Sequence, residues 1–226
     1  MSKNKKLPEI VTAKGIAVYP KLNEPDTKYN KEGVYEVKLT FESADDPAVQ
    51  AMVKRIEQER DTFFDAKVAE LKGEGKGAAA KQLKKADILK PELDKETGDE
   101  TGRVYIKAKM SASGTREDGT KWTQKPNYFS ASGKQLKNPP RIGGGSVLKL
   151  GVALKPYVIE SSKEVGVTLR LKAVQIISLV SGGSRSFESY GFQAEDGDEI
   201  DDAEFDANTS DDDAAGGSAA DEDDDL

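Results

Sequence analysis

The stretch Arg103-Val-Tyr-Ile-Lys-Ala-Lys-Met-Ser111 decides how this sequence folds. Every second side chain is apolar and belongs to one face: Val104, Ile106, Ala108 and Met110. The side chains between them are basic or aromatic and belong to the other face: Arg103, Tyr105, Lys107 and Lys109. Successive side chains of a β-strand point to opposite faces, so the pattern predicts a strand with one face in the core and the other exposed.

Other strands are predicted from alternation or from β-branched composition: Ile10–Tyr19, Gly33–Phe41, Ser146–Tyr157 and Val165–Val180. The turn signal Glu117-Asp-Gly119 predicts that Lys121–Ser130 returns as the second strand of a hairpin. The side chains predicted to face the core on these strands are Tyr35, Val37, Leu39, Phe41, Leu148, Leu150, Val152, Leu154, Val165, Val167, Leu169, Leu171 and Ala173.

Asp45-Asp46-Pro47 opens the one predicted helix, because Asp caps helix N-termini and Pro suits the first helical position. Apolar residues recur every three or four positions over Val49–Leu71, so the helix is expected to reach Gly73 and to cover an end or edge of the sheet. Gly73–Lys85 and Pro91–Gly102 have weak periodicity and are predicted to be mobile excursions from the core.

Several strands, one helix and no βαβ rhythm predict a mainly β fold, either a small antiparallel barrel or a strongly bent sheet. Residues 1–180 are assigned to this domain. Residues 181–194 are a predicted Gly- and Ser-rich linker, and residues 195–226 are a predicted disordered acidic tail.

The formal net charge of −7 hides a division of the chain into a basic body and an acidic tail. Residues 195–226 contain 16 Asp and Glu and no Lys or Arg. Residues 1–194 contain all 34 basic residues and the remaining 25 of the 41 acidic ones, so they carry a charge of +9. Such asymmetry indicates nucleic-acid binding or a regulatory tail.

Cysteine and histidine are absent, which excludes thiolate nucleophiles, disulfides, His-based triads and most transition-metal sites. The glycines of Gly114–Gly119 have P-loop spacing, but Thr120-Lys121 follow in the wrong order and a turn explains them better. We therefore predict no enzyme activity, cofactor or metal site; a carboxylate-based nuclease lacks a candidate pair. No apolar run suits a membrane span or signal peptide, so we expect a protein that stays where it is made.

Basic and aromatic side chains share the outward faces of the predicted strands. Single-stranded nucleic acid needs this combination, because aromatic rings stack on any base while Lys and Arg follow the phosphates. The predicted stacking residues are Tyr157, Trp122 and Tyr105, and the predicted phosphate-binding residues are Arg103, Lys107, Lys109, Lys125, Lys149 and Lys155. Gly151 and Ala153 would let the strand approach closely. An ordinary solvent face is the alternative, and Trp122 fits the core equally well.

The acidic tail either adds only solubility or competes with nucleic acid for the basic face. A flexible chain of its length spans roughly 30 Å. A compact body of this size has a radius of gyration of about 16 Å. The tail can therefore reach the basic face and act as an intramolecular competitor.

Three motifs are similar to those of one protein family: Gly33-Val-Tyr-Glu-Val-Lys-Leu-Thr40, Ile142-Gly-Gly-Gly-Ser146 and Lys155-Pro-Tyr157. With the terminal acidic tail, they resemble the gene 2.5-type single-stranded DNA-binding proteins of short-tailed bacteriophages. The resemblance implies an OB-fold, a five-stranded barrel with one capping helix. It also implies DNA replication, recombination, repair and annealing in the cytoplasm of an infected bacterial host, a base-stacking role for Tyr157, and dimerisation.

The same resemblance implies that the tail recruits the phage DNA polymerase and the helicase–primase. The residues assigned to this contact are Asp221, Glu222, Asp223, Asp224, Asp225 and Leu226. Two departures from the family pattern are Ile159 and Leu226, because typical members have an aromatic residue at both positions. An RNA-binding OB-fold module and an acidic-tailed protein chaperone are the alternative functions.

Overall fold

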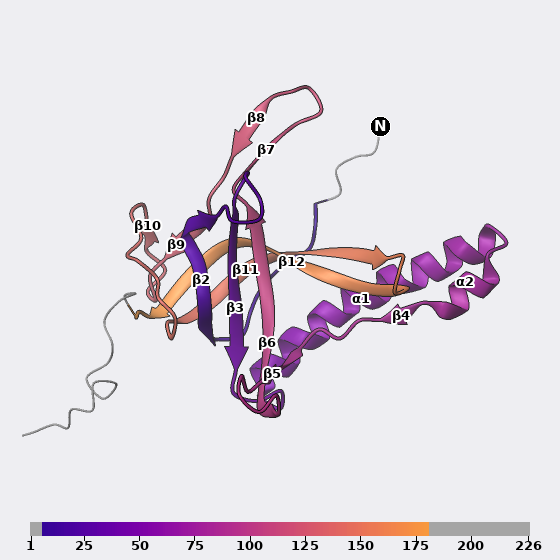
Figure 1. The fold of residues 1–226 in the computed structure, drawn as a ribbon, viewed down its shortest axis with the longest axis horizontal. Coiled ribbons are helices and arrows are strands. Elements are labelled where there is room, and N and C mark those ends of the chain that lie inside the picture. Colours follow the sequence, from indigo (N-terminus) through magenta and orange to yellow (C-terminus); the bar gives the residue numbers. More distant parts are fainter. Residues whose placement is uncertain (1–5, 181–226) are drawn as a thin grey trace, which may run out of the picture. The chain divides into compact units, whose positions relative to one another are not determined.

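The computed structural model describes residues 6–180, and this part of the chain is mainly β with two helices (Figure 1). The strands are β1 (Glu9–Val11), β2 (Gly15–Asp26), β3 (Val34–Phe41), β4 (Lys84–Lys85), β5 (Lys90–Leu93), β6 (Glu100–Ser111), β7 (Ser113–Thr115), β8 (Lys121–Thr123), β9 (Asn127–Phe129), β10 (Gln135–Leu136), β11 (Val147–Ile159) and β12 (Glu164–Ser178). The helices are α1 (Pro47–Gly73) and α2 (Gly77–Gln82). The predicted linker 181–194 and acidic tail 195–226 lie outside the described residues.

Five long strands form the centre of the sheet, and their pairings close on themselves. β11 pairs with β2, β2 with β3, β3 with β6 and β6 with β12, and β12 pairs back with β11. The β6–β12 pairing is parallel, so the prediction of a wholly antiparallel sheet is wrong at β12. The whole β7–β11 segment joins these two strands, which is long enough to bring them side by side in the same direction.

Alternation places the predicted core residues inside on β3, β6 and β11. On β6, Ile106 and Ala108 are buried, whereas Lys107 between them is exposed. The core residues confirmed on these strands are Tyr35, Val37, Leu39, Phe41, Ile106, Ala108, Met110, Leu148, Leu150, Val152 and Leu154. The apolar face of the sequence pattern is therefore the inner face of the sheet.

The alternation of β12 changes phase at Lys172. Val152 on β11 pairs with Leu171, and the preceding Gly151 pairs with Ala173, so Lys172 is an extra residue on β12. Such a bulge reverses which side chains face inward. Leu171 is buried as predicted, but Val174 replaces Ala173 as the next core residue, and the prediction of Ala173 is wrong.

The predicted strand Ile10–Tyr19 is two strands, β1 and β2. The chain leaves β1 at Thr12, whose hydroxyl accepts a hydrogen bond of 3.0 Å from the Leu150 N–H on β11. β2 then continues through Pro20 instead of ending before it. A register shift between Val18 and Lys21 lets β2 bend past the proline, which has no N–H to contribute.

Helix α1 begins and ends as predicted. The Asp46 carboxylate accepts hydrogen bonds from the N–H groups of Ala48 at 2.7 Å and Val49 at 3.3 Å, and Pro47 is the first helical residue. The buried side chains lie in the first half of the helix: Val49, Met52, Ile56 and Arg60. Helix α1 contacts β11 and β12, and its distal half runs beside the far ends of these strands, where Lys67 and Leu71 line a hollow with Val158 (Figure 1).

The two predicted excursions contain regular structure, so that prediction is wrong. Gly73–Lys85 contains α2 and β4, and β4 pairs with β12. Pro91–Gly102 includes most of β5, which pairs with β6 through Lys90 and Tyr105. β4 pairs with a strand far along the sequence and β5 pairs with the next strand, but few side chains of either segment enter the core, which explains the weak local periodicity.

The predicted hairpin is confirmed only in its outer part. β7 and β8 form a separate two-stranded sheet that projects from the main sheet (Figure 1). The rest of Lys121–Ser130 leaves the hairpin as β9, which pairs with β12. Burial of Tyr128 explains the departure: its hydroxyl donates to the Leu22 carbonyl, and burial raises its pKa to about 12.

Within the described residues, neither helix combines the length and apolar character needed to cross a membrane.

Replacing Asp46 with Ala removes the cap of α1 and should lower the free energy of unfolding by about 1 kcal/mol. Asp45→Ala is the matched control, because the neighbouring carboxylate caps no helical N–H group. Urea unfolding followed by circular dichroism measures both changes. Equal losses in the two variants would contradict the cap assignment.

Candidate nucleic-acid interface

Three of the predicted site residues converge on one hollow of about 120 Å³. Tyr105 and Lys107 reach it from β6, and Tyr157 reaches it from the end of β11. Lys90 of β5 lines the same hollow. Both tyrosines are half-buried, so each ring is held by the protein on part of its surface and is accessible on the rest.

The position of Tyr157 depends on a glycine across the β11–β12 pair. Tyr157 is in register with Gly166, and a Cβ atom at Gly166 would lie 2.5 Å from the Tyr157 hydroxyl oxygen. The tyrosine ring therefore lies across the β12 backbone at a place that only glycine leaves open. This contact directs the ring toward the hollow that it shares with Tyr105.

Tyr105 lies beneath two lysine side chains. The Lys38 ammonium is 4.3 Å and the Lys107 ammonium 5.9 Å from the centre of its ring. Lys38 is also ion-paired with Glu92 of β5 at 2.5 Å. The register explains this grouping, because Lys38 on β3 pairs with Lys107 on β6, next to the Thr40–Tyr105 pair.

Two predicted phosphate-binding residues already contact carboxylates. Lys109 pairs with Glu36 at 2.9 Å, and Arg103 pairs with Glu42 at 3.1 Å. All four side chains are substantially exposed, so each pair contributes about 0–1 kcal/mol and can exchange one anion for another. The other predicted phosphate-binding residues form no ion pair with any of the described residues: Lys107, Lys125, Lys149 and Lys155.

Lys149 lies apart from this group. It lines a different hollow of about 520 Å³, between β1 and the first turns of α1, together with Lys14 and Arg55. The expectation that Gly151 and Ala153 admit a nucleic-acid strand is wrong, because β1 pairs with β11 at these positions and Ala153 is only 2% exposed. Lys155 is exposed farther along β11, two residues before Tyr157.

Trp122 and Lys125 belong to the projecting hairpin and its exit. The Trp122 ring lies against Gly114 across the β7–β8 pair, where a Cβ atom would approach the ring to 2.6 Å. The tryptophan is therefore outside the main core and half-buried within the hairpin. Lys125 is exposed in the connection between β8 and β9.

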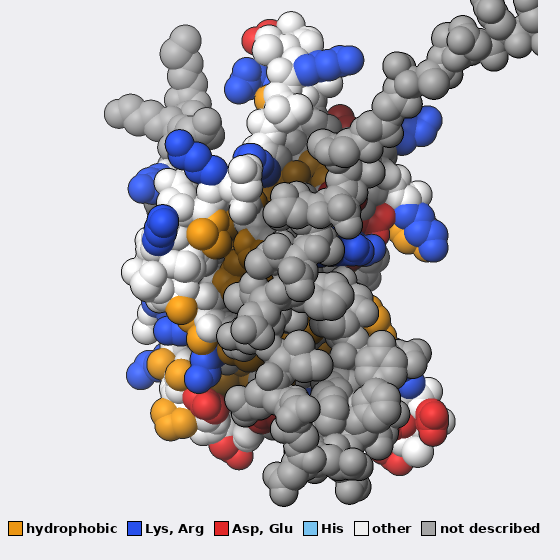
Figure 2. All heavy atoms as spheres, turned by 90° about the vertical axis from the view of Figure 1, so that its left-hand side faces the viewer, with side chains coloured by type: hydrophobic (Ala, Val, Ile, Leu, Met, Phe, Trp, Pro, Cys, Tyr) orange, Lys and Arg blue, Asp and Glu red, His pale blue; other side chains and the backbone are white. Residues whose placement is uncertain are grey.

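Sequence reasoning missed four residues beside this group: Tyr19, Lys38, Lys90 and Lys95. Lys38 had a usable signal, because it alternates with core residues of β3 just as Lys107 does on β6. On the face at the left of Figure 1, Lys and Arg side chains are spread along the upper, left and right margins (Figure 2). Positive charge alone therefore does not mark the site, and the combination with aromatic rings does.

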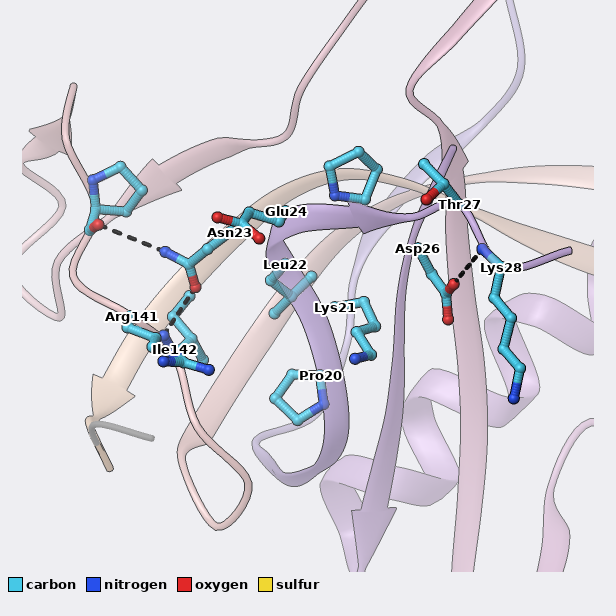
Figure 3. A pocket seen from close by; sticks show the side chains of 12 residues that line it. Pro20, Lys21, Leu22, Asn23, Glu24, Asp26, Thr27, Lys28, Arg141 and Ile142 are labelled. Carbon is cyan, nitrogen blue, oxygen red and sulfur yellow. Dashed lines mark hydrogen bonds between the residues drawn. The ribbon is translucent and has the colours of Figure 1, made fainter. Parts of the chain in front are cut away.

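Another hollow, of about 670 Å³, contains none of the predicted residues (Figure 3). It lies between β2 and the loop that precedes β11. Asn23 joins its two sides by donating to the Pro140 carbonyl at 2.8 Å and accepting from the Ile142 N–H at 2.8 Å. Its charged lining residues carry both signs: Lys21, Glu24, Asp26, Lys28 and Arg141.

Over residues 6–180, no three acidic side chains gather into a metal-binding group. The Tyr105–Tyr157 hollow offers aromatic rings for stacking and the ammonium groups of Lys90 and Lys107 for attracting anions, beside the carboxylate of Asp87.

The geometry defines a mainly β protein with an aromatic and basic outer face, and comparison with known proteins agrees with it. Residues 14–179 match the family described as "Single-stranded DNA-binding protein, Bacteriophage T7". The single-stranded DNA-binding protein of Enterobacteria phage T3 is 32% identical over 173 residues, which are 74% of this chain and 72% of that protein. That of Escherichia phage T7 is 33% identical over 158 residues, 68% of this chain and 66% of that protein.

A solved structure shares the fold. The crystal structure of gp2.5, a single-stranded DNA-binding protein encoded by bacteriophage T7, has a TM-score of 0.62 and 25% sequence identity, covering 86% of this chain and 100% of that one. The chain therefore belongs to the bacteriophage T7 single-stranded DNA-binding protein family. This family is non-enzymatic, in agreement with the prediction from the sequence.

Replacing Gly166 with Ala should displace the Tyr157 ring and lower the free energy of unfolding by about 1–3 kcal/mol, because the new methyl group overlaps the ring. The same substitution in a Tyr157→Ala background should cost much less, because the ring is gone. Denaturant unfolding of the wild type, the two single variants and the double variant measures the coupling energy between Gly166 and Tyr157. An equal cost in both backgrounds would show that the ring does not lie over Gly166.

Proposed function

We propose that this chain binds single-stranded DNA without strong sequence preference, by base stacking and phosphate neutralisation. One observation carries the proposal: Tyr105 and Tyr157, from different strands, line one hollow together with Lys90 and Lys107. The relatives from phages T3 and T7 are named single-stranded DNA-binding proteins, which supports the same function here.

The stacking step uses the accessible parts of the two rings. A base that leaves its own stack in solution can stack on tyrosine, and because every base has a π-face this contact tolerates any sequence. Half-burial limits the motion of the rings before binding, so little side-chain entropy is lost on contact.

The phosphate step uses the cations around the rings. Lys107 and Lys155 are exposed, and Lys109 and Arg103 can exchange their carboxylate partners for phosphate oxygens. Each neutralised phosphate releases counterions, so affinity should fall as salt rises.

The closed circuit of pairings β11–β2–β3–β6–β12–β11 supports an OB-type, five-stranded barrel as the scaffold. Helix α1, inserted between β3 and β6, would cap one end of it.

The biological setting proposed is phage DNA replication and recombination in the cytoplasm of the infected host. The acidic tail, outside the described residues, would compete with DNA for the basic face and recruit the phage DNA polymerase and helicase–primase. The competition is supported by the opposite charges of the two parts: residues 1–194 carry a charge of +9, and residues 195–226 contain 16 acidic residues. A homodimer is part of the same proposal.

Replacing Tyr157 with Ala should weaken binding of a fluorescent oligothymidylate by about 1–3 kcal/mol, because one stacked base loses its platform. Tyr157→Phe is the matched control and should bind nearly as the wild type does. Fluorescence anisotropy gives both affinities. Competition with duplex DNA and with a matched RNA tests the function itself, and no binding of single-stranded DNA would overturn it.

Removing residues 195–226 should tighten binding, most strongly at low salt, because an anionic competitor is lost. The comparison is made by anisotropy of the same oligonucleotide at two salt concentrations. Weaker or unchanged binding by the shortened chain would contradict competition by the tail.

A further inference from the structure

Tyr19 is an exposed aromatic side chain held in an uncommon backbone conformation. The residue is 68% exposed, and its φ of 48° lies in the left-handed region that residues other than glycine and asparagine rarely adopt. The cause is the bulge in β2, where three steps from Val18 to Lys21 oppose two steps on β3. Backbone conformations of this kind gather at functional sites, so they justify a functional hypothesis.

A second segment holds the Tyr19 ring from outside the sheet. Lys95, in the turn between β5 and β6, donates a hydrogen bond to the Tyr19 hydroxyl, and its ammonium lies 5.0 Å from the ring centre. This hydrogen bond and the lysine charge lower the pKa of Tyr19. Asp94 fixes the turn by accepting from the N–H groups of Glu96 at 2.8 Å and Thr97 at 3.0 Å.

Cations of the predicted site lie beside Tyr19. A hollow of about 130 Å³ is lined by Tyr19, Glu36, Lys38 and Lys107, together with apolar residues of β2 and β3. Val18 pairs with Lys38, and Lys38 pairs with Lys107, so the two lysines are the next residues across the sheet from the bulge. Both ammonium groups also lie over Tyr105.

Glu36, the acidic residue that lines this hollow, is matched by a cation, and so is Glu92, which contacts Lys38 from β5. Glu36 pairs with Lys109 at 2.9 Å, and Glu92 pairs with Lys38 at 2.5 Å. Lys107 has no carboxylate partner among residues 6–180. The hollow therefore combines an aromatic platform with positive charge, the chemistry that recognises a nucleobase and its phosphate.

We propose that Tyr19, positioned by Lys95, is a further nucleobase subsite, so that the single strand crosses β2, β3 and β6. One base stacks on Tyr19, the next phosphate lies at Lys38 and Lys107, and later bases reach Tyr105 and Tyr157. This inference rests on the proposed function and extends it, because it adds a platform that the sequence pattern did not indicate.

The chain offers a matched control for Tyr19. Tyr29 is 89% exposed and also has a lysine, Lys28, 5.2 Å from its ring centre. It lies in the connection between β2 and β3 and does not line the hollow. Tyr19 and Tyr29 thus share exposure and a neighbouring lysine, but only Tyr19 lines the hollow.

The first test measures the affinity of the full chain for oligothymidylates of increasing length. Tyr19→Ala should bind the longer oligonucleotides about 5- to 100-fold more weakly than the wild type, and the shortest ones almost equally. Tyr29→Ala should match the wild type at every length. Tyr19→Phe, which keeps the ring and loses the Lys95 hydrogen bond, should lie between Tyr19→Ala and the wild type.

The second test uses the unaltered protein, so it does not depend on how a variant folds. An oligonucleotide containing bromodeoxyuridine is irradiated in complex with the full chain, and the adducts are located by mass spectrometry. The proposal predicts an adduct at Tyr19 and none at Tyr29.

The outcomes separate this inference from the proposed function. If Tyr157→Ala weakens binding while Tyr19→Ala does not, and no adduct forms at Tyr19, the Tyr19 subsite is wrong and the function stands. If the wild type binds no single-stranded DNA, both are wrong. Weaker binding by Tyr29→Ala to the same extent as by Tyr19→Ala would also overturn the subsite.

Discussion

The antiparallel pairing of β11 with β12 is the interaction on which the rest of the structure depends. It runs from the Val147–Ser178 pair to the Ile159–Glu164 pair. β11 meets β2 at the first two residues of this pairing, and β12 meets β6 near its middle, at Leu169 and Arg170, so the pairing closes the circuit of strands around the core. Its far end places Tyr157 opposite Gly166 and brings the ring to Tyr105. One pairing thus holds the scaffold together and positions the candidate site.

The outer face of the sheet follows from the burial of the inner one. Because side chains alternate, fixing Ile106 and Ala108 in the core forces Tyr105 and Lys107 outward, and the same holds for Lys38 on β3. Two cations of this face, Arg103 and Lys109, pair with carboxylates on the exposed surface, where ion pairs contribute little and exchange readily. A polyanion that neutralises both of them at once can therefore displace the carboxylates.

Prediction from the sequence succeeded where inward and outward side chains alternate without interruption along a strand. It failed where pairing with a strand distant in the sequence changes that alternation. β3, β6 and α1 were predicted closely, because period and capping are local properties. The bulge at Lys172 and the bend at Tyr19 have no local signal, because β-strand pairing sets them. The separation of Lys149 from Tyr105 was also missed, because alternation assigns a face but says nothing of how the sheet curves.

Lysine footprinting tests the central claim, that the outer face of β3 and β6 with the end of β11 is the DNA interface. The full chain is acetylated with and without saturating oligothymidylate, and protection is read by mass spectrometry. We expect strong protection of Lys38, Lys107 and Lys155, with little change at Lys54 and Lys72 on α1. Protection of the helix lysines, with Lys107 still reactive in the complex, would contradict that claim.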